Sequence, residues 1–251
     1  MNILLIGATG GIGSALTKSL SKNHNLFIGS RNNENLSILK NSISTVNKID
    51  SHIVDVCEFE SINTFLDEGY NSLGSINCII NCSGSLLLKP AHLTSEEEIE
   101  SIFRTNVFSC FHLLKGGFKF LKDNGGSFIF FSSAASKIGL KNHEAIASAK
   151  GAVSSLVLSA ASTYANYNIR INAIAPGLVD TNMTKRITSN KPSLEFSKKL
   201  HVEEIILTKR KYSKLKFDTL QQMCIKRANF LYTNYRRNCS NWPYIANILP
   251  F

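Results

Sequence analysis

Residues 3–13 of the 251-residue chain read Ile-Leu-Leu-Ile-Gly-Ala-Thr-Gly-Gly-Ile-Gly, and this stretch decides the fold. The four apolar residues are typical of a buried strand, and the glycines allow a sharp turn into a helix. Such a turn lets the backbone approach a pyrophosphate, which the free N–H groups of the helix N-terminus then bind. A lone glycine cluster is weak evidence, but here the required strand and helix surround it. The stretch predicts a dinucleotide site formed by Gly7, Thr9, Gly11, Ile12 and Gly13.

Short apolar runs alternate with longer helical stretches along the rest of the chain, up to about residue 175. Helices are expected at residues 14–21, 58–68, 95–121 and 142–167. Strands are expected at residues 3–6, 26–28, 53–54, 76–80, 128–131 and 169–174. Strands separated by helices imply right-handed crossovers. The sequence therefore predicts an α/β fold with a Rossmann-like, doubly wound parallel sheet and helices on both faces.

The composition excludes several classes of protein. Apolar residues make up 43% of the chain and the mean hydropathy is −0.01, which excludes a disordered chain, a collagen-like chain and a membrane bundle. No apolar stretch approaches the roughly 20 residues that span a bilayer, and the N-terminus lacks the basic start of a signal peptide. The six cysteines show no metal-like spacing, and Cys78 lies in an apolar strand. We expect a cytoplasmic protein with reduced thiols, no metal and no membrane contact.

The net charge of +10 is distributed unevenly along the chain. Residues 1–200 have 19 basic and 15 acidic side chains, whereas residues 201–251 have nine and three. All 15 glycines lie between Gly7 and Gly177. The chain therefore divides into a dinucleotide-binding domain, residues 1–200, and a basic, glycine-free tail, residues 201–251.

Polar motifs follow the later strands in a definite order. Read alone, each has an ordinary explanation: Asn106 as a polar helix residue, Ser133 as a turn residue and Lys150 as a solvated lysine. Only their joint order is informative. Along the chain they are Asp55-Val56, Asn81-Cys82-Ser83-Gly84, Thr105-Asn106-Val107, Ser132-Ser133, Lys150, and residues 176–181, which read Pro-Gly-Leu-Val-Asp-Thr.

With the spacing Gly-x-x-x-Gly-x-Gly at the first turn, this order resembles the short-chain dehydrogenase/reductase family over residues 1–185. The resemblance implies hydride transfer between a nicotinamide cofactor and a small-molecule carbonyl or alcohol. It also implies a homo-oligomer, a tetramer or dimer, that packs through the two long helices. The implied catalytic residues are Asn106, whose carbonyl holds a relay water, Ser133 and Lys150. The implied cofactor contacts are Asp55, Val56, Asn81, Gly84, Lys150, Pro176, Gly177, Val179 and Thr181.

The choice between NAD(H) and NADP(H) depends on the residues at the end of the second strand. An acidic residue there would bind both ribose hydroxyls and repel a 2′-phosphate. The chain instead has Ser30 followed by Arg31, a hydroxyl and a guanidinium that suit a phosphate. The alternative is that Arg31 is only a solvated loop residue. We predict NADP(H), with NAD(H) as the second choice.

The family's catalytic tyrosine is absent from this chain. The family spaces tyrosine and lysine as Tyr-x-x-x-Lys, and the tyrosine position here is Ile146. Isoleucine has no proton to donate, and general acid–base help is worth about 10²–10⁴-fold in rate. The chain is therefore either a slow oxidoreductase or a non-catalytic dinucleotide-binding relative, regulatory or vestigial. His143, one turn before Ile146, is a substitute acid or only a residue that decorates the helix start.

Residues 201–251 do not resemble the family's ending. Their mixture of basic and aromatic residues is one that a nucleic-acid binder can use, although nucleic acid is the less favoured partner. Alternatively, the tail is an out-of-frame reading of the normal ending. One choice of codons for residues 234–242, read one base later, gives Ile-Thr-Gly-Glu-Ile-Val-Ala-Ile-Gly. The frameshift hypothesis predicts that the seventh strand is missing and that the sixth strand forms an open edge.

Overall fold

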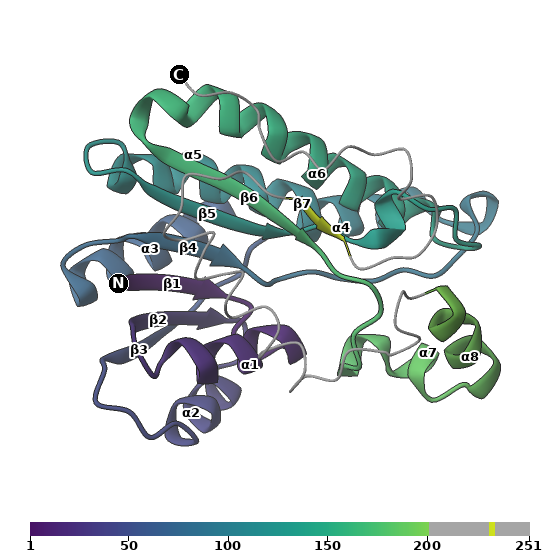
Figure 1. Cartoon of the computed structure of the whole chain (residues 1–251), viewed down its shortest axis with the longest axis horizontal. Coiled ribbons are helices and arrows are strands. Elements are labelled where there is room, and N and C mark those ends of the chain that lie inside the picture. Colours follow the sequence, from purple (N-terminus) through teal and green to yellow (C-terminus); the bar gives the residue numbers. More distant parts are fainter. Residues whose placement is uncertain (201–230, 234–251) are drawn as a thin grey trace.

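The computed structural model describes residues 1–200 and 231–233, with side chains up to residue 195. All neighbouring strands are parallel, in the order β3-β2-β1-β4-β5-β6-β7 (Figure 1). The predicted Rossmann-like fold is therefore confirmed. The strands are β1 (Asn2–Ile6), β2 (Asn25–Ser30), β3 (Ile49–Ile53), β4 (Cys78–Asn81), β5 (Gly126–Phe131), β6 (Ile169–Ala175) and β7 (Leu231–Thr233).

Helices connect the strands and cover both faces of the sheet. The longer ones are α1 (Gly11–Leu20), α2 (Asn33–Asn41), α3 (Phe59–Leu73), α4 (Glu96–Phe103), α5 (Ser109–Leu121), α6 (Glu144–Tyr164) and α8 (Lys191–Leu200). The short ones are η1 (Ala91–Leu93), the π-helical turn η2 (Arg104–Phe108), η3 (Ala134–Ser136), η4 (Ala165–Tyr167), η5 (Asn182–Thr184) and α7 (Lys185–Thr188).

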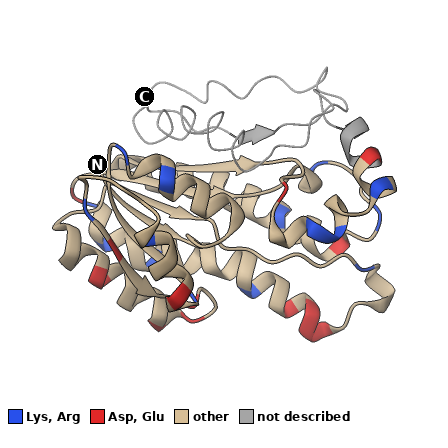
Figure 2. Ribbon diagram, turned by 90° about the horizontal axis from the view of Figure 1, so that it is seen from below, with Lys and Arg blue, Asp and Glu red and all other residues tan. Residues whose placement is uncertain are grey.

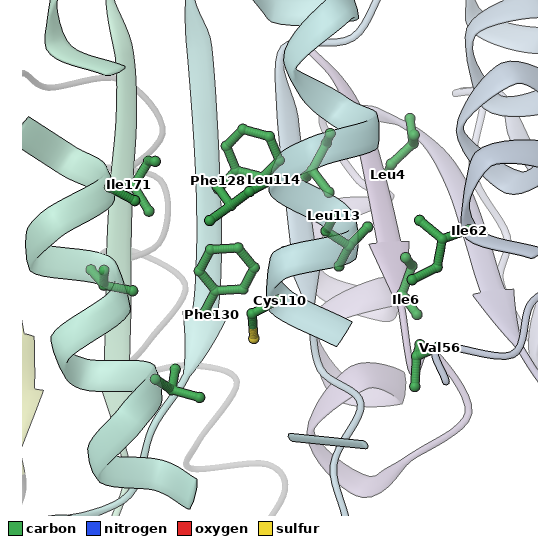
Figure 3. Close-up of a cluster of buried hydrophobic side chains, with 14 of the residues drawn as sticks. Leu4, Ile6, Val56, Ile62, Cys110, Leu113, Leu114, Phe128, Phe130 and Ile171 are labelled. Atoms are coloured by element: carbon green, nitrogen blue, oxygen red, sulfur yellow. The ribbon is translucent and has the colours of Figure 1, made fainter. Parts of the chain in front are cut away.

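Alternate residues of the central strands, such as β1 and β5, belong to two separate cores, because successive side chains of a strand point to opposite faces. Leu4 and Ile6 of β1 pack with residues of α3, α5 and α6, as Figure 3 shows for Ile62 and Leu113. The intervening residues of β1 pack with α1 and α2 on the other face. Because both faces are covered, central strands such as β1 and β5 read as continuous apolar runs, and Cys78 of β4 is buried as predicted.

The structure differs from the predicted elements in three places, each for a physical reason. The third strand runs over Ile49–Ile53 rather than residues 53–54, because β3 is a partly exposed edge strand with the polar interior Asp-Ser-His. Helix α2 was not predicted, since it has only Leu36 and Leu39 as buried residues and depends on capping by Asn32. The helix expected at residues 95–121 is interrupted by the π-helical turn η2.

One helix contradicts the expectation that no stretch approaches membrane-spanning length. Residues 144–167, which are α6 and η4 together, are long and apolar enough to cross a bilayer by length and composition. Ile146, Val153 and Val157 of this helix belong to the core cluster under the sheet. The apolar composition of α6 is therefore explained by packing against β5 and β6.

A seventh strand is present as three residues. In β7, Leu231–Thr233 pairs with Ala173–Ala175 of β6 in parallel register. The predicted consequence of a frameshift, an unpaired sixth strand, is therefore wrong over these three residues. The other predictions for the tail, a frameshift or a nucleic-acid surface, concern residues 201–230 and 234–251, which lie outside the described part. Within the described part, charges of both signs are interspersed (Figure 2).

Candidate active site and dinucleotide cleft

The predicted site residues gather where the parallel strands end. Gly7, Ser30 and Asn81 end or follow β1, β2 and β4, and Ser133 and Pro176 follow β5 and β6. Because the strands are parallel, all these positions lie at one edge of the sheet. The order of strands reverses between β1 and β4, and such a switch point is where open α/β sheets bind ligands.

The glycine turn is fixed by close backbone packing. Gly7 has a φ of +75°, and a Cβ atom on it would lie 2.6 Å from the Ser83 backbone nitrogen. A Cβ atom on Gly13 would lie only 2.1 Å from the Gly7 carbonyl oxygen. The Gly7 and Ala8 N–H groups both donate to the Gly29 carbonyl, at 2.9 and 3.0 Å. Both glycines are therefore required by geometry: a side chain on Gly7 would clash with the backbone after β4, and one on Gly13 would push α1 away from the end of β1.

The N-terminus of α1 has the features of an anion site. Gly10 caps the helix without a side-chain hydrogen bond, and the first turn has no acidic residue. The N–H groups of Gly11, Ile12 and Gly13 therefore meet no side-chain cap, and the positive end of the helix dipole is not neutralised there. These residues fit the pyrophosphate of a dinucleotide, as the sequence predicts.

At the end of β2, a hydroxyl network holds Ser30 and leaves Arg31 outside. Thr9 donates through its Oγ1 to Ser30 Oγ at 3.0 Å, and the Asn32 N–H donates to the same oxygen at 3.2 Å. Ser30 is buried, whereas Arg31 is exposed and forms no ion pair or hydrogen bond with the described residues. No acidic side chain occupies this strand end. The predicted preference for a 2′-phosphate at this strand end stays a prediction.

Asp55 and Val56 form the turn after β3. One carboxylate oxygen of Asp55 accepts the Cys57 N–H at 2.9 Å, and the Asp55 N–H donates to Ser61 Oγ at 2.9 Å. Val56 is buried in the core. The predicted contact of these two residues with a cofactor remains a prediction, since the turn alone gives each of them a structural role.

Asn81 and Gly84 connect β4 to the helices behind it. The buried Asn81 amide donates to Ser109 Oγ at 3.1 Å, and its oxygen accepts the Ser83 N–H at 3.0 Å. A Cβ atom on Gly84 would lie 3.1 Å from Asn106 Oδ1 and 3.6 Å from Lys150 Nζ. The position of Gly84 therefore shows that two predicted catalytic residues, Asn106 and Lys150, lie at the same spot.

Asn106 lies in the π-helical turn η2, between α4 and α5. Its amide donates to the Ile102 carbonyl at 2.9 Å and to Ser85 Oγ at 3.0 Å. The wider π-turn disturbs the usual i→i−4 bonding, and side chains bond to the carbonyls instead. Cys110 donates through its thiol to the Asn106 carbonyl at 3.3 Å. The family resemblance implies that this carbonyl holds a water molecule. In this chain the Cys110 thiol also contacts it.

Ser132 and Ser133 have different environments after β5. Ser132 is buried and bonds to the Lys150 carbonyl at 2.9 Å and to Ser154 Oγ at 2.7 Å, which fixes α6 against the sheet. Ser133 is partly exposed, and its Oγ accepts the Ala135 N–H at 3.1 Å. No described residue accepts a hydrogen bond from the Ser133 hydroxyl.

Lys150 is a partly buried cation with an unusual environment. Its Nζ donates to the Phe131 carbonyl at 2.7 Å, and no carboxylate of the described residues forms an ion pair with it. Burial lowers the pKa of Lys150 to about 8, and the nearby thiols of Cys110 and Cys82 oppose that shift. Burial also raises the pKa of Cys110 to about 11 and raises the pKa of Cys82, so both thiols stay neutral at pH 7.

Ile146 and His143 lie one and two turns before Lys150 on α6. The Ile146 side chain is 4% exposed and belongs to the core cluster. His143 precedes the helix but does not cap it with its side chain. Its Nδ1 lies 2.7 Å from the Lys141 carbonyl, which can only accept, so Nδ1 carries the proton of this bond.

The segment after β6 borders the same edge of the sheet. The Pro176 carbonyl accepts the Ala134 N–H at 2.9 Å, which joins this segment to the loop that contains Ser133. Val179 is buried, and the Thr181 and Thr184 hydroxyls lie 3.1 Å apart. Gly177 follows Pro176 in the same loop. A polar cavity of about 330 Å³ lies beside it, lined by Asp180, Thr181, Asn182, Lys185, Thr188 and Ser189.

Sequence reasoning missed the groups that hold the predicted residues in place. Ser85, Ser154 and the Phe131 carbonyl bond to Asn106 or Lys150, and Cys110 contacts the Asn106 carbonyl. A serine or cysteine at these positions has no spacing signal of its own. Only the fold, which brings residues 85, 106 and 150 together, reveals these contacts.

A parallel sheet with a glycine turn at its switch point defines a Rossmann-type dinucleotide-binding protein. The profile of the family described as short chain dehydrogenase matches residues 1–192. The chain belongs to the short-chain dehydrogenase/reductase family, which is a family of oxidoreductases.

Two relatives illustrate the similarity in sequence. A chloroplastic tropinone reductase homolog of Arabidopsis thaliana is 32% identical over 202 residues, which are 78% of this chain and 62% of the relative. The match thus spans less than two thirds of that relative's length. A 3-oxoacyl-[acyl-carrier-protein] reductase of Thermotoga maritima is 27% identical over 217 residues, 81% of this chain and 87% of the relative.

Solved structures share the fold. A Tyr-to-Phe variant of ElxO with NADPH bound superimposes with a TM-score of 0.81 at 24% identity, covering 92% of this chain and 96% of its own. An actinorhodin polyketide ketoreductase variant with NADPH gives a TM-score of 0.75 at 19% identity, covering 86% and 89%. At these identities the likeness establishes the fold.

Proposed function

We propose that this chain is an NADP(H)-dependent oxidoreductase that acts on a small-molecule carbonyl or alcohol. The observation that supports it most is the cluster of Gly84, Asn106 and Lys150 at the end of β4, together with the uncapped N-terminus of α1. In this proposal, the cluster and the N-terminus of α1 each hold a part of the bound dinucleotide. Ser133, whose hydroxyl donates to no described residue, orients the substrate oxygen.

The preference for NADP(H) rests on Ser30 and Arg31. The exposed guanidinium of Arg31 has no described partner and is available to a 2′-phosphate. Two structures with the same fold were determined with NADPH. Residues Asp55, Val56, Asn81, Pro176, Gly177, Val179 and Thr181 are proposed as the remaining cofactor contacts.

Turnover of a carbonyl panel tests this function. Purified full chain is mixed with NADPH and with a panel of ketones and aldehydes, and oxidation of the cofactor is followed by its absorbance. We expect slow oxidation that depends on the carbonyl compound. If NADPH binds but no member of the panel is reduced, the chain is the non-catalytic relative that Ile146 suggests.

The family resemblance is also the basis on which we propose an oligomeric state and a cellular location. A homodimer or homotetramer through α5 and α6 is expected, because exposed apolar residues lie on both helices, including Phe111 and Leu158. Size-exclusion chromatography with light scattering measures that state directly. A cytoplasmic location and the absence of a nucleic-acid partner stay predictions.

A further inference from the structure

We propose that Lys150 itself donates the proton to the substrate oxygen, in place of the hydroxyl that Ile146 lacks. The inference rests on the proposed oxidoreductase function and adds the group that completes the reaction. It also decides between the two candidate donors near Ile146, Lys150 and His143.

The reaction requires a proton as well as a hydride. When bound, the reduced nicotinamide supplies the hydride to the carbonyl carbon. The electron pair of the C=O π bond then moves to oxygen, which must form an O–H bond. In our proposal the Lys150 ammonium breaks one N–H bond to supply this proton and becomes a neutral amine. The amine takes a proton from water before the next turnover, so the cycle balances.

The surroundings of Lys150 suit a donor. Its Nζ lies where β4, β5 and the π-turn meet, 2.7 Å from the Phe131 carbonyl and 3.6 Å from the position of a Cβ on Gly84. An ammonium has three N–H groups, and the described residues provide a hydrogen-bond acceptor for only one of them. The other two are available to a substrate oxygen or a water molecule.

The surroundings of Lys150 favour the loss of a proton from its ammonium group. The ionisable groups of the described residues that act on it are Cys82, from the loop after β4, and Cys110, from α5, and both are neutral thiols. No carboxylate of the described residues stabilises the ammonium, and burial lowers the pKa of Lys150 to about 8. A general acid is most effective when its pKa lies near the working pH.

His143 is less suited to the same role. It lies at the beginning of α6, two turns before Lys150, and its Nδ1–H is bonded to the Lys141 carbonyl. No described contact joins its ring to Asn106, Gly84 or Ser133, whereas Gly84 lies beside both Asn106 and Lys150. A His143→Ala variant is therefore expected to keep its rate.

The test compares Lys150→Arg with Lys119→Arg. Arginine keeps the positive charge but does not release its proton, since its pKa is above 12. Lys119 is an exposed lysine paired with Asp67 at 2.7 Å and serves as the matched control. The first readout needs no turnover: full chain is labelled with a trace amine-reactive reagent from pH 6 to 11, and each lysine is quantified by peptide mass spectrometry. We expect labelling of Lys150 to titrate near pH 8.

The second readout is the pH dependence of carbonyl reduction in a single turnover with NADPH. In the unaltered chain the rate should fall tenfold per pH unit above about 8, with the midpoint found by labelling. Lys150→Arg should reduce the single-turnover rate at saturating NADPH by about 10²-fold or more and abolish that pH dependence. Lys119→Arg should change neither.

The outcomes separate the inference from the proposed function. If the unaltered chain reduces carbonyls and Lys150→Arg keeps its rate and pH profile, the inference is overturned and the oxidoreductase function stands. If only Ile146→Tyr reduces carbonyls, Lys150 is not a donor, and the inference is overturned as well. If neither the unaltered chain nor Ile146→Tyr reduces any carbonyl, the proposed function itself fails.

Discussion

At the scale of single residues, Ile146 is the residue that we expect to limit the rate of the proposed reaction. It occupies the position of a tyrosine in a chain whose serine and lysine are otherwise present, and its side chain is packed into the core. We expect Ile146→Tyr to raise carbonyl turnover at least tenfold, because a hydroxyl is added one helical turn from Lys150. Ile146→Phe is the matched control, since it adds the ring without the hydroxyl. Equal rates for the two variants would show that the hydroxyl does not reach the substrate.

We expect the choice between NADPH and NADH to depend on Arg31. It is exposed at the end of β2, where no acidic side chain competes for the ribose. A hydrogen bond to a charged group is worth about 1.5–3 kcal/mol, so Arg31→Ala should weaken NADPH binding about tenfold or more. Calorimetric titration measures this loss. The affinity for NADH should stay the same, and a parallel loss for both cofactors would contradict a contact with the 2′-phosphate.

His24 makes stability sensitive to acid. It is 7% exposed, and both of its ring nitrogens lack a hydrogen-bond partner. Burial, and then the charge of the N-terminus, lower its pKa below 6.5. The unfolded chain therefore binds the proton more readily, and stability that is present above pH 6.5 is lost as the pH falls towards the folded-state pKa. The loss is at most about 1.4 kcal/mol per pH unit.

Urea denaturation of the unaltered chain and of His24→Leu at pH 7.5 and 5.5 measures that loss. Because leucine does not titrate, the fall in the free energy of unfolding between the two pH values should be smaller in the variant. An equal fall in both proteins would assign the acid sensitivity to other groups.

At the scale of elements, two glycines within helices have opposite roles. A Cβ on Gly13 of α1 would overlap the Gly7 carbonyl at 2.1 Å, whereas no atom of the described residues lies within 4 Å of a Cβ on Gly151 of α6. Gly13→Ala should therefore destabilise the fold and weaken cofactor binding at least tenfold. Gly151→Ala should instead stabilise the fold by about 0.5–1 kcal/mol, since alanine favours helix. Thermal unfolding of both variants checks this contrast, and a stable Gly13→Ala protein that binds NADPH normally would refute it.

The elements that escaped prediction share a physical cause. Helix α2 and strand β3 are exposed on one side and contain few apolar residues, so their periodicity is weak. The π-turn η2 leaves no trace in a pattern of apolar residues, because it shifts the register by a single residue. Strands that are covered on both faces, such as β1 and β5, are read directly from their apolar runs.

For the whole molecule, the sequence predicts which residues form the site but not how they are held. The order of motifs places Asn106, Ser133 and Lys150 at one edge of the sheet, because parallel strands all end there. The lowered pKa of Lys150 and the contact between Cys110 and Asn106 depend on burial and on the packing of α5 and α6 against β5. These are tertiary properties, and no local pattern encodes them.

The central claim is that this fold holds a dinucleotide whose 2′-phosphate meets Arg31 at the end of β2. Calorimetric titration of the purified full chain with NADPH and with NADH tests it most directly. We predict one binding site per chain and NADPH binding at least about tenfold tighter than NADH binding, as expected for one charge-assisted contact. Tighter binding of NADH, or no binding of either cofactor, would contradict the account.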